Sequence, residues 1–241
     1  NVFLRYQVRK QLMKLFQEQF KLLVICIEAS QRFVSKLEGV TDPDKKRKII
    51  GAEFIAVFDE AAGEIARSAG RAPSYLVQGT VYPDVIESSP GHKHAMKNKT
   101  HHNVGGMQKD MKLKLIDPLR ALFKDEVREL GRRLRVPEDF LKRHPFPGPG
   151  LAVRVIGEIT RENLTILRQV DEIFVQSIQE AGLYEKIWQA FAVFLPIKSV
   201  GVQGDIRTHD HAVALRAVTS SDGMTADWFH FESKFLAKVS S

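Results

Sequence analysis

The sequence predicts an α/β fold with a doubly wound parallel sheet, followed by a smaller α+β domain. Two apolar runs of strand length, Leu22–Ile27 and Tyr75–Gln78, are separated by helical patterns, and this order is typical of a doubly wound sheet. Nearer the other end of the chain, the apolar runs 190–195, 199–202 and 212–218 follow one another without a helix between them, which indicates an antiparallel sheet.

Each element of the first domain has a local signal. Apolar residues at helical spacing predict a helix over about residues 5–20, and Leu22–Ile27 predicts a buried strand that encloses the single cysteine, Cys26. Thr41-Asp42-Pro43 predicts the start of a second helix, because a capping side chain is followed by proline. We further expect a strand at 75–78, a loop to residue 106, a strand at 111–116 and a helix at 123–134.

The second domain follows a segment that can be neither a helix nor a central strand. Residues 143–150 hold three prolines and two glycines, which predicts an ordered connector or a hinge. A strand is expected at 151–156, and then a helix that begins at the capping residue Thr160 and stops at Gly182. A last helix is predicted at 227–239.

Basic residues are concentrated in the first domain. The chain of 241 residues has a formal net charge of +7, with 27 basic and 18 acidic side chains in residues 1–150 but 9 and 11 in residues 151–241. This patch predicts an anionic partner, with a solvated basic face as the alternative. The single cysteine, and the lack of a membrane-length apolar run or a signal peptide pattern, lead us to expect a cytoplasmic protein without a membrane partner.

Acidic residues and a polar cluster follow the predicted strand at 75–78. Asp84 and Glu87, three residues apart in the expected loop, suit Mg²⁺, and an exposed acidic turn is the alternative. The cluster could neutralise charge on a transferring phosphoryl group; it comprises Lys99, Thr100, His101, His102 and Asn103. A zinc site that combines its histidines with His92 and His94 is the less favoured interpretation.

Two further short patterns are less specific. Lys124 and Asp125 begin a predicted helix whose free N–H groups would suit an anion, although the pair is also an ordinary helix start. Gly201-Val202-Gln203-Gly204 matches the G-x-x-G loop of RNA-binding KH modules, but glycines at this spacing are also common in hairpins.

Several of these strings occur in order, and together they resemble glutamine-hydrolysing GMP synthases. The resemblance covers essentially the whole chain and rests on these segments: Gln78–Ser88, Lys99–Gly106 (KTHHNVGG), 123–128 (FKDEVR), Arg143–Leu151 (RHPFPGPGL), Gln189–Pro196, Ser199–Asp205 and Leu215–Val218. It implies that residues 1–147 are part of an ATP-pyrophosphatase domain of the adenine-nucleotide alpha-hydrolase-like fold, with a lid loop at about 88–106. Residues 148–241 would be a truncated α+β dimerization domain.

The resemblance also implies a reaction and its residues. Xanthosine monophosphate (XMP) would be adenylated on its 2-oxygen by ATP with Mg²⁺, and ammonia from a glutaminase domain or subunit would then displace AMP and give GMP. The implied catalytic residues are Asp84, Glu87, Lys99, Thr100, His101, His102, Asn103, Lys124 and Asp125. Gln78, Gly79 and Thr80 would bind ATP, Arg143 and Gln203 would bind XMP, and residues 151–241 would form a homodimer. No nucleic-acid partner is expected.

The sequence departs from the family's pattern in places. The family's SGGVDS pyrophosphate loop, its glutaminase domain and its C-terminal KPPxTIEWE segment do not occur, so we expect this chain alone to be inactive. His209 and Gly223 stand where the family usually has tyrosine and a hydrophobic residue. Two rival interpretations are another ATP pyrophosphatase, such as a tRNA-thiolating or argininosuccinate-forming enzyme, and a KH-like RNA-binding module.

Overall fold

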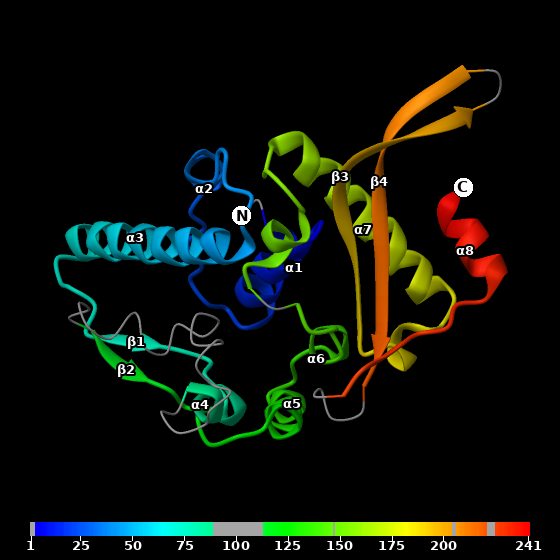
Figure 1. The fold of residues 1–241 in the computed structure, drawn as a ribbon. Coiled ribbons are helices and arrows are strands. Elements are labelled where there is room, and N and C mark those ends of the chain that lie inside the picture. Colours follow the sequence, from blue (N-terminus) through cyan, green and yellow to red (C-terminus); the bar gives the residue numbers. More distant parts are fainter. Residues whose placement is uncertain (1–2, 89–112, 147, 204–205, 221–224) are drawn as a thin grey trace. The chain divides into compact units, whose positions relative to one another are not determined.

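The computed structural model describes residues 3–88, 113–146, 148–203, 206–220 and 225–241 (Figure 1). The chain forms two compact units: unit 1 comprises residues 1–46 and 144–241, and unit 2 comprises residues 47–143. The chain therefore passes between the units at residues 46–47 and again at 143–144. The second passage lies close to the predicted domain change at 147–148, whereas the first 46 residues are grouped with the C-terminal half. The domain division itself stays a prediction.

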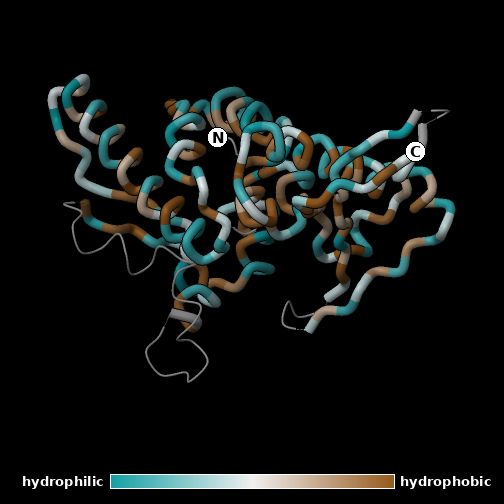
Figure 2. The backbone as a smooth tube through the Cα atoms, turned by 45° about the horizontal axis from the view of Figure 1, so that its top comes forward, coloured by the Kyte–Doolittle hydropathy of each residue, from teal (hydrophilic) through white to brown (hydrophobic). Residues whose placement is uncertain are grey.

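A long helix, α3 (Pro43–Ala69), begins at the end of unit 1 and continues into unit 2. The Lys45 N–H donates to Asp42 Oδ1 at 2.8 Å, which confirms the predicted start. In Figure 2, where the backbone is coloured by hydropathy, hydrophilic and hydrophobic residues are interspersed along this helix. The helix ends before Gly70, which has a φ of +68°, as expected of a glycine that stops a helix.

The sheet of unit 2 is parallel and two-stranded. Strand β1 (Tyr75–Val77) pairs with β2 (Lys114–Ile116) in the register Leu76↔Leu115. Helix α4 (Tyr82–Ser88) follows β1, and α5 (Lys124–Arg133) and α6 (Glu138–Leu141) follow β2. Both strands and α5 confirm the corresponding predictions. With the antiparallel sheet of unit 1, they make a mixed α/β structure.

A long hairpin dominates the C-terminal part of unit 1. Strands β3 (Gln189–Gln203), β4 (Ile206–Thr219) and β5 (Asp227–Trp228) form an antiparallel sheet in that order. The three predicted apolar runs thus belong to two strands, which extend past α7 in Figure 1. Between the pairs Phe194↔Val213 and Lys198↔His211 the register shifts. Pro196 lies in this bulge, where its missing N–H costs no ladder hydrogen bond.

Helix α7 (Arg161–Glu180) packs on β3 and supplies much of the core of unit 1. Thr160 Oγ1 accepts the Asn163 N–H at 3.1 Å, and Gly182 has a φ of +66°, so both predicted ends are confirmed. Helix α8 (Ser233–Ser240) begins later than predicted, because residues 227–228 pair with β4 instead. The core cluster near α8 comprises Phe174, Ile178, Ile187, Ala190 and Ala217, with Tyr184, Phe229, Phe231 and Phe235 packed against it.

The predicted buried strand Leu22–Ile27 is wrong. The segment belongs to neither sheet, Leu23 is 92% exposed, and Cys26 is exposed rather than buried. It lies between the N-terminal helices α1 (Val8–Lys14) and η1 (Leu15–Gln19, π-helical) and the later α2 (Ser30–Lys36). An apolar run becomes a buried strand only where neighbouring strands accept its backbone hydrogen bonds, and the sequence pattern carries no information about those neighbours.

The predicted strand at 151–156 is wrong as well. Its first part is a 3-10 helix, η2 (Gly150–Arg154), and only Val155 forms a bridge, to Phe194. The Leu151 N–H donates to Phe3 O at 3.0 Å, so the N-terminal segment rather than a strand satisfies this backbone. A second short 3-10 helix, η3 (Tyr184–Lys186), precedes β3. Within the described ranges, no helix is both long and apolar enough to cross a bilayer.

Candidate functional site

The carboxyl ends of β1 and β2 meet at one edge of the parallel sheet, where ligands bind in folds of this class. The Gln78 N–H donates to Ile116 O at 3.0 Å, so the segments that follow the two strands start side by side. The Tyr82 N–H donates to Leu122 O at 2.9 Å, and the rings of Tyr82 and Phe123 lie 5.2 Å apart. These contacts bring the starts of α4 and α5 together at this edge.

The predicted ATP-binding residues occupy the turn between β1 and α4. Gln78 is half-buried, Gly79 is exposed and Thr80 is buried. Lys124 and Asp125 begin α5 at the same edge, and both are exposed. The structure therefore places these five predicted residues on the two segments that leave the carboxyl edge of the sheet.

Asp84 and Glu87 were expected in a loop, and this expectation is wrong, because both lie in helix α4. Asp84 Oδ2 accepts the Val81 N–H at 3.1 Å, a contact that stabilises the start of the helix. Proline at residue 83 is compatible with the first helical turn, and together with Asp84 it was a start signal that the sequence reasoning missed. Residues three apart on a helix share a face; the side chain of Glu87 lies outside the described part.

The predicted polar cluster lies entirely outside the described residues: Lys99, Thr100, His101, His102 and Asn103. His92 and His94, on which the zinc interpretation depends, are outside them too. Among the side chains that the structure does describe, no group of three His, Cys, Asp or Glu residues could hold a metal ion.

Asp117 is a further residue at this edge that the sequence reasoning did not single out. It directly follows β2, its side chain is 7% exposed, and its Oδ2 lies 3.5 Å from the Arg120 guanidinium. Its Oδ1 is buried without a hydrogen-bond partner in the described part of the chain. Burying a carboxylate oxygen without a hydrogen-bond donor costs free energy of folding, and buried polar atoms of this kind often lie at functional sites. The sequence signal that could have indicated Asp117 as a site residue was an acidic residue directly after an apolar run and before a proline.

The two predicted XMP-binding residues are on different units. Arg143 ends unit 2, where its guanidinium stacks over the Phe140 ring at 4.2 Å from the centroid. Gln203 is the last residue of β3, and its side chain lies outside the described part. Gly201, the first glycine of the G-x-x-G match, pairs with Thr208 across the hairpin, and a Cβ there would come within 2.7 Å of Thr208 Oγ1. The close approach of β3 and β4 therefore explains why residue 201 is a glycine.

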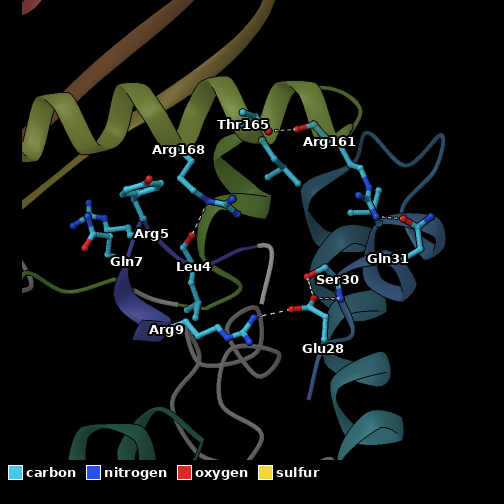
Figure 3. Close-up of a pocket in the computed structure, with 13 residues that line it drawn as sticks. Leu4, Arg5, Gln7, Arg9, Glu28, Ser30, Gln31, Arg161, Thr165 and Arg168 are labelled. Atoms are coloured by element: carbon cyan, nitrogen blue, oxygen red, sulfur yellow. Dashed lines mark hydrogen bonds and ion pairs between the residues drawn. The ribbon is translucent and has the colours of Figure 1, made fainter. Parts of the chain in front are cut away.

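Unit 1 contains a basic cavity of about 620 Å³. Residues 4–7 and Arg9, residues in and just before the first turns of α2, and the first turns of α7 line it (Figure 3). Its walls carry four arginines, which are Arg5, Arg9, Arg161 and Arg168, and a single carboxylate, Glu28. A concave surface with this excess of guanidinium groups suits an anionic ligand such as a phosphate.

Each cavity arginine is held by a neighbour, so the basic wall is pre-organised. Arg5 pairs with Asp171 at 2.8 Å, and Arg9 pairs with Glu28 at 2.9 Å. Arg161 donates to Gln31, and Arg168 Nε donates to Leu4 O at 3.2 Å. Hydrogen bonds from Ser30, and the nearby Arg9, lower the pKa of Glu28, whereas burial lowers the pKa of Arg168. The cavity was not predictable, because residues about 160 positions apart form it.

Comparison with known proteins identifies relatives of this chain. Residues 176–241 match the family model described as GMP synthase C terminal domain. The glutamine-hydrolyzing GMP synthases of Debaryomyces hansenii and Saccharomyces cerevisiae are each 54% identical over 241 residues, which is 100% of this chain and 46% of each relative. That of Thermotoga maritima is 55% identical over 225 residues, 93% of this chain and 44% of the relative. The chain thus spans about half the length of the curated relatives it matches, and the resemblance predicted from the sequence is confirmed.

Proposed function

Because this chain aligns over its whole length with glutamine-hydrolyzing GMP synthases, we propose that the protein containing it converts XMP to GMP. The observation that carries the proposal is the 54% identity over 241 residues. In this reaction the 2-oxygen of XMP attacks the α-phosphorus of ATP and pyrophosphate leaves. Ammonia then attacks C2 of the adenylated base, and AMP leaves with the oxygen. Ammonia would come from a glutaminase domain or subunit.

ATP would bind at the carboxyl edge of the parallel sheet. Gln78, Gly79 and Thr80 lie there beside the starts of α4 and α5, and Lys124 and Asp125 would support the transferred adenylyl group. Charge on the leaving pyrophosphate would be neutralised by the cluster of Lys99, Thr100, His101, His102 and Asn103.

Mg²⁺ is a further part of the proposal. Carboxylate oxygens are the ligands that it prefers, and Asp84 and Glu87 are two carboxylate residues of the helix that follows β1. Asp84 and Glu87 would hold the ion on one face of α4, and it would neutralise the phosphates of ATP.

XMP would be bound by Arg143 and by Gln203, the latter from a partner copy. The stacking of Arg143 on Phe140 supports this role, because a guanidinium held in place can meet two phosphate oxygens without a large ordering cost. A homodimer through residues 151–241 is supported by the hairpin, on which Ile197 and Val200 are 59% and 61% exposed.

The test is to give the intact protein XMP, ATP, Mg²⁺ and ammonia and to follow nucleotides by chromatography. The proposal requires equal amounts of GMP and AMP, and glutamine should replace ammonia when the glutaminase part is present. Formation of AMP only with tRNA, or with citrulline and aspartate, would instead identify another ATP pyrophosphatase.

A further inference from the structure

The proline- and glycine-rich connector is not a free hinge, because its first residue in unit 1 is fixed by Tyr184. The imidazole of His144 and the Tyr184 ring are stacked with centroids 3.8 Å apart and planes at 5°. The His144 backbone N–H donates to the Tyr184 hydroxyl at 3.2 Å, and His144 Nε2 lies 2.8 Å from Tyr184 O. One residue thus holds both the backbone and the ring of the other.

The contact with Tyr184 O determines the protonation of His144. A carbonyl oxygen only accepts, so Nε2 carries the proton. Nδ1 is buried without a partner in the described part of the chain, so a second proton there would have no acceptor. Burial lowers the pKa of His144 and outweighs the hydrogen bond to Tyr184 O, which raises it, while the nearby Arg5 charge lowers it further. His144 is therefore neutral and has a defined tautomer.

Other described residues of the connector are also held within unit 1. Gln189 Nε2 donates to Pro145 O at 2.9 Å. The Phe146 ring has the Arg5 guanidinium 4.5 Å and the Arg154 guanidinium 4.0 Å from its centroid. Gly150, with a φ of +74°, lies so close to the N-terminal segment that a Cβ would come within 2.5 Å of Phe3 O. The main chain is thus restrained at residues 144, 145 and 150.

The residue that precedes this restrained segment is Arg143, the last residue of unit 2. We propose that Tyr184 is a positioning residue for XMP, which fixes, through His144, the main chain from which Arg143 extends. This inference rests on the proposed role of Arg143 in XMP binding. Tyr184 would act only through His144, since its hydroxyl accepts the His144 backbone N–H and its carbonyl oxygen accepts the proton of the His144 imidazole.

Tyr184 also packs against the core cluster, so a loss of stability must be separated from a loss of positioning. Tyr184→Phe keeps the ring and removes only the hydroxyl that accepts the His144 N–H. His144→Gln keeps an amide donor at about the place of Nε2, whereas His144→Leu removes it. Phe231→Leu perturbs the same core cluster away from the connector and serves as the matched stability control.

The experiment measures KM for XMP, KM for ATP and kcat of the intact protein and these variants, with melting temperatures recorded in parallel. Tyr184→Phe should raise KM for XMP by about 2- to 10-fold, the range that one hydrogen bond can shift. Its KM for ATP and its kcat should be unchanged. His144→Leu should behave in the same way, His144→Gln should recover at least half of the loss, and Phe231→Leu should lower the melting temperature without changing KM for XMP.

The outcomes separate this inference from the proposed function. If the unaltered protein does not use XMP, the proposed function is wrong and the inference fails with it. If it uses XMP and Tyr184→Phe and His144→Leu leave KM for XMP unchanged, only the positioning role is overturned. A rise in KM for XMP that Phe231→Leu reproduces at an equal loss of melting temperature also overturns it.

Discussion

Replacing Asp171 by asparagine should markedly destabilise unit 1. Asp171 Oδ2 pairs with Arg5 Nε at 2.8 Å, and the two side chains are only 2% and 13% exposed. Asp171 also opposes the positive charge around Arg154, whose pKa is lowered to about 10, first by burial and then by Arg5, with Arg216 contributing further. Asparagine can still accept the Ala192 N–H, which Asp171 Oδ1 accepts at 3.0 Å, but its amide NH₂ would then face Arg5 Nε, so the substitution removes both the charge and the acceptor of the ion pair.

Removing one partner of a buried ion pair costs about 3–5 kcal/mol, and the retained hydrogen bond places Asp171→Asn near the lower value. For a chain of this size that corresponds to a fall in melting temperature of about 6–12 °C. The matched control is Glu180→Gln on the same helix, where Glu180 pairs with Lys238 at 2.9 Å but both side chains are at least 50% exposed. Exposed pairs contribute little, so the control should melt like the unaltered protein. The reasoning is refuted if thermal unfolding, followed by circular dichroism, shifts equally in the two variants.

Three further predictions concern the cap of α7, the neutral histidine and the proposed substrate contacts. Thr160→Ala removes the acceptor of the Asn163 N–H and should cost about 1 kcal/mol in urea unfolding, with no change in nucleotide affinity. The pKa of His144 is lowered from 6.5 in the folded protein, so protonation of this residue favours the unfolded state. The free energy of unfolding should therefore be unaffected by His144 above about pH 6.5 and should fall as the pH is lowered from there toward the folded-state pKa. His144→Gln should flatten this fall between pH 7 and 5, and an identical fall in both proteins would contradict the assignment. Arg143→Lys should weaken XMP by about 1–3 kcal/mol in calorimetric titration although the charge is kept, while ATP affinity stays the same; equal XMP affinities would remove Arg143 from the site.

Elements with strong local signals were predictable from the sequence. Helix α7 begins at Thr160, whose hydroxyl caps it, and stops at Gly182, whose positive φ few other residues tolerate. Helix α3 begins just after Asp42, whose carboxylate caps it by accepting the Lys45 N–H. These signals act over three or four residues, so the sequence contains all the information that they need.

Features that depend on distant partners were not predictable. Leu22–Ile27 has the composition of a buried strand, but no strand of either sheet accepts it. The segment after Gly150 has the composition of a strand too, yet Phe3, far away in the sequence, satisfies its backbone. The basic cavity likewise joins Arg5 and Arg9 to Arg161 and Arg168. In each case the outcome is decided by which segments meet in space, and local patterns do not encode that.

The candidate site was predictable only where its geometry follows from the order of the elements along the chain. The position of Gln78–Thr80, Lys124 and Asp125 at the carboxyl edge follows from parallel pairing, which the order of elements predicts. The helical rather than loop conformation of Asp84 depends on hydrogen bonds that composition does not reveal, and so does the lack of a partner for Asp117 Oδ1 among the described residues.

The most direct test of the account follows the oxygen that is displaced from XMP. The intact protein is given XMP labelled with ¹⁸O at the 2-position, together with ATP, Mg²⁺ and ammonia, and the nucleotide products are analysed by mass spectrometry. Adenylation of XMP predicts that each AMP formed carries one ¹⁸O atom and that pyrophosphate carries none. AMP without the label, or formation of ADP and phosphate in place of AMP and pyrophosphate, would contradict it.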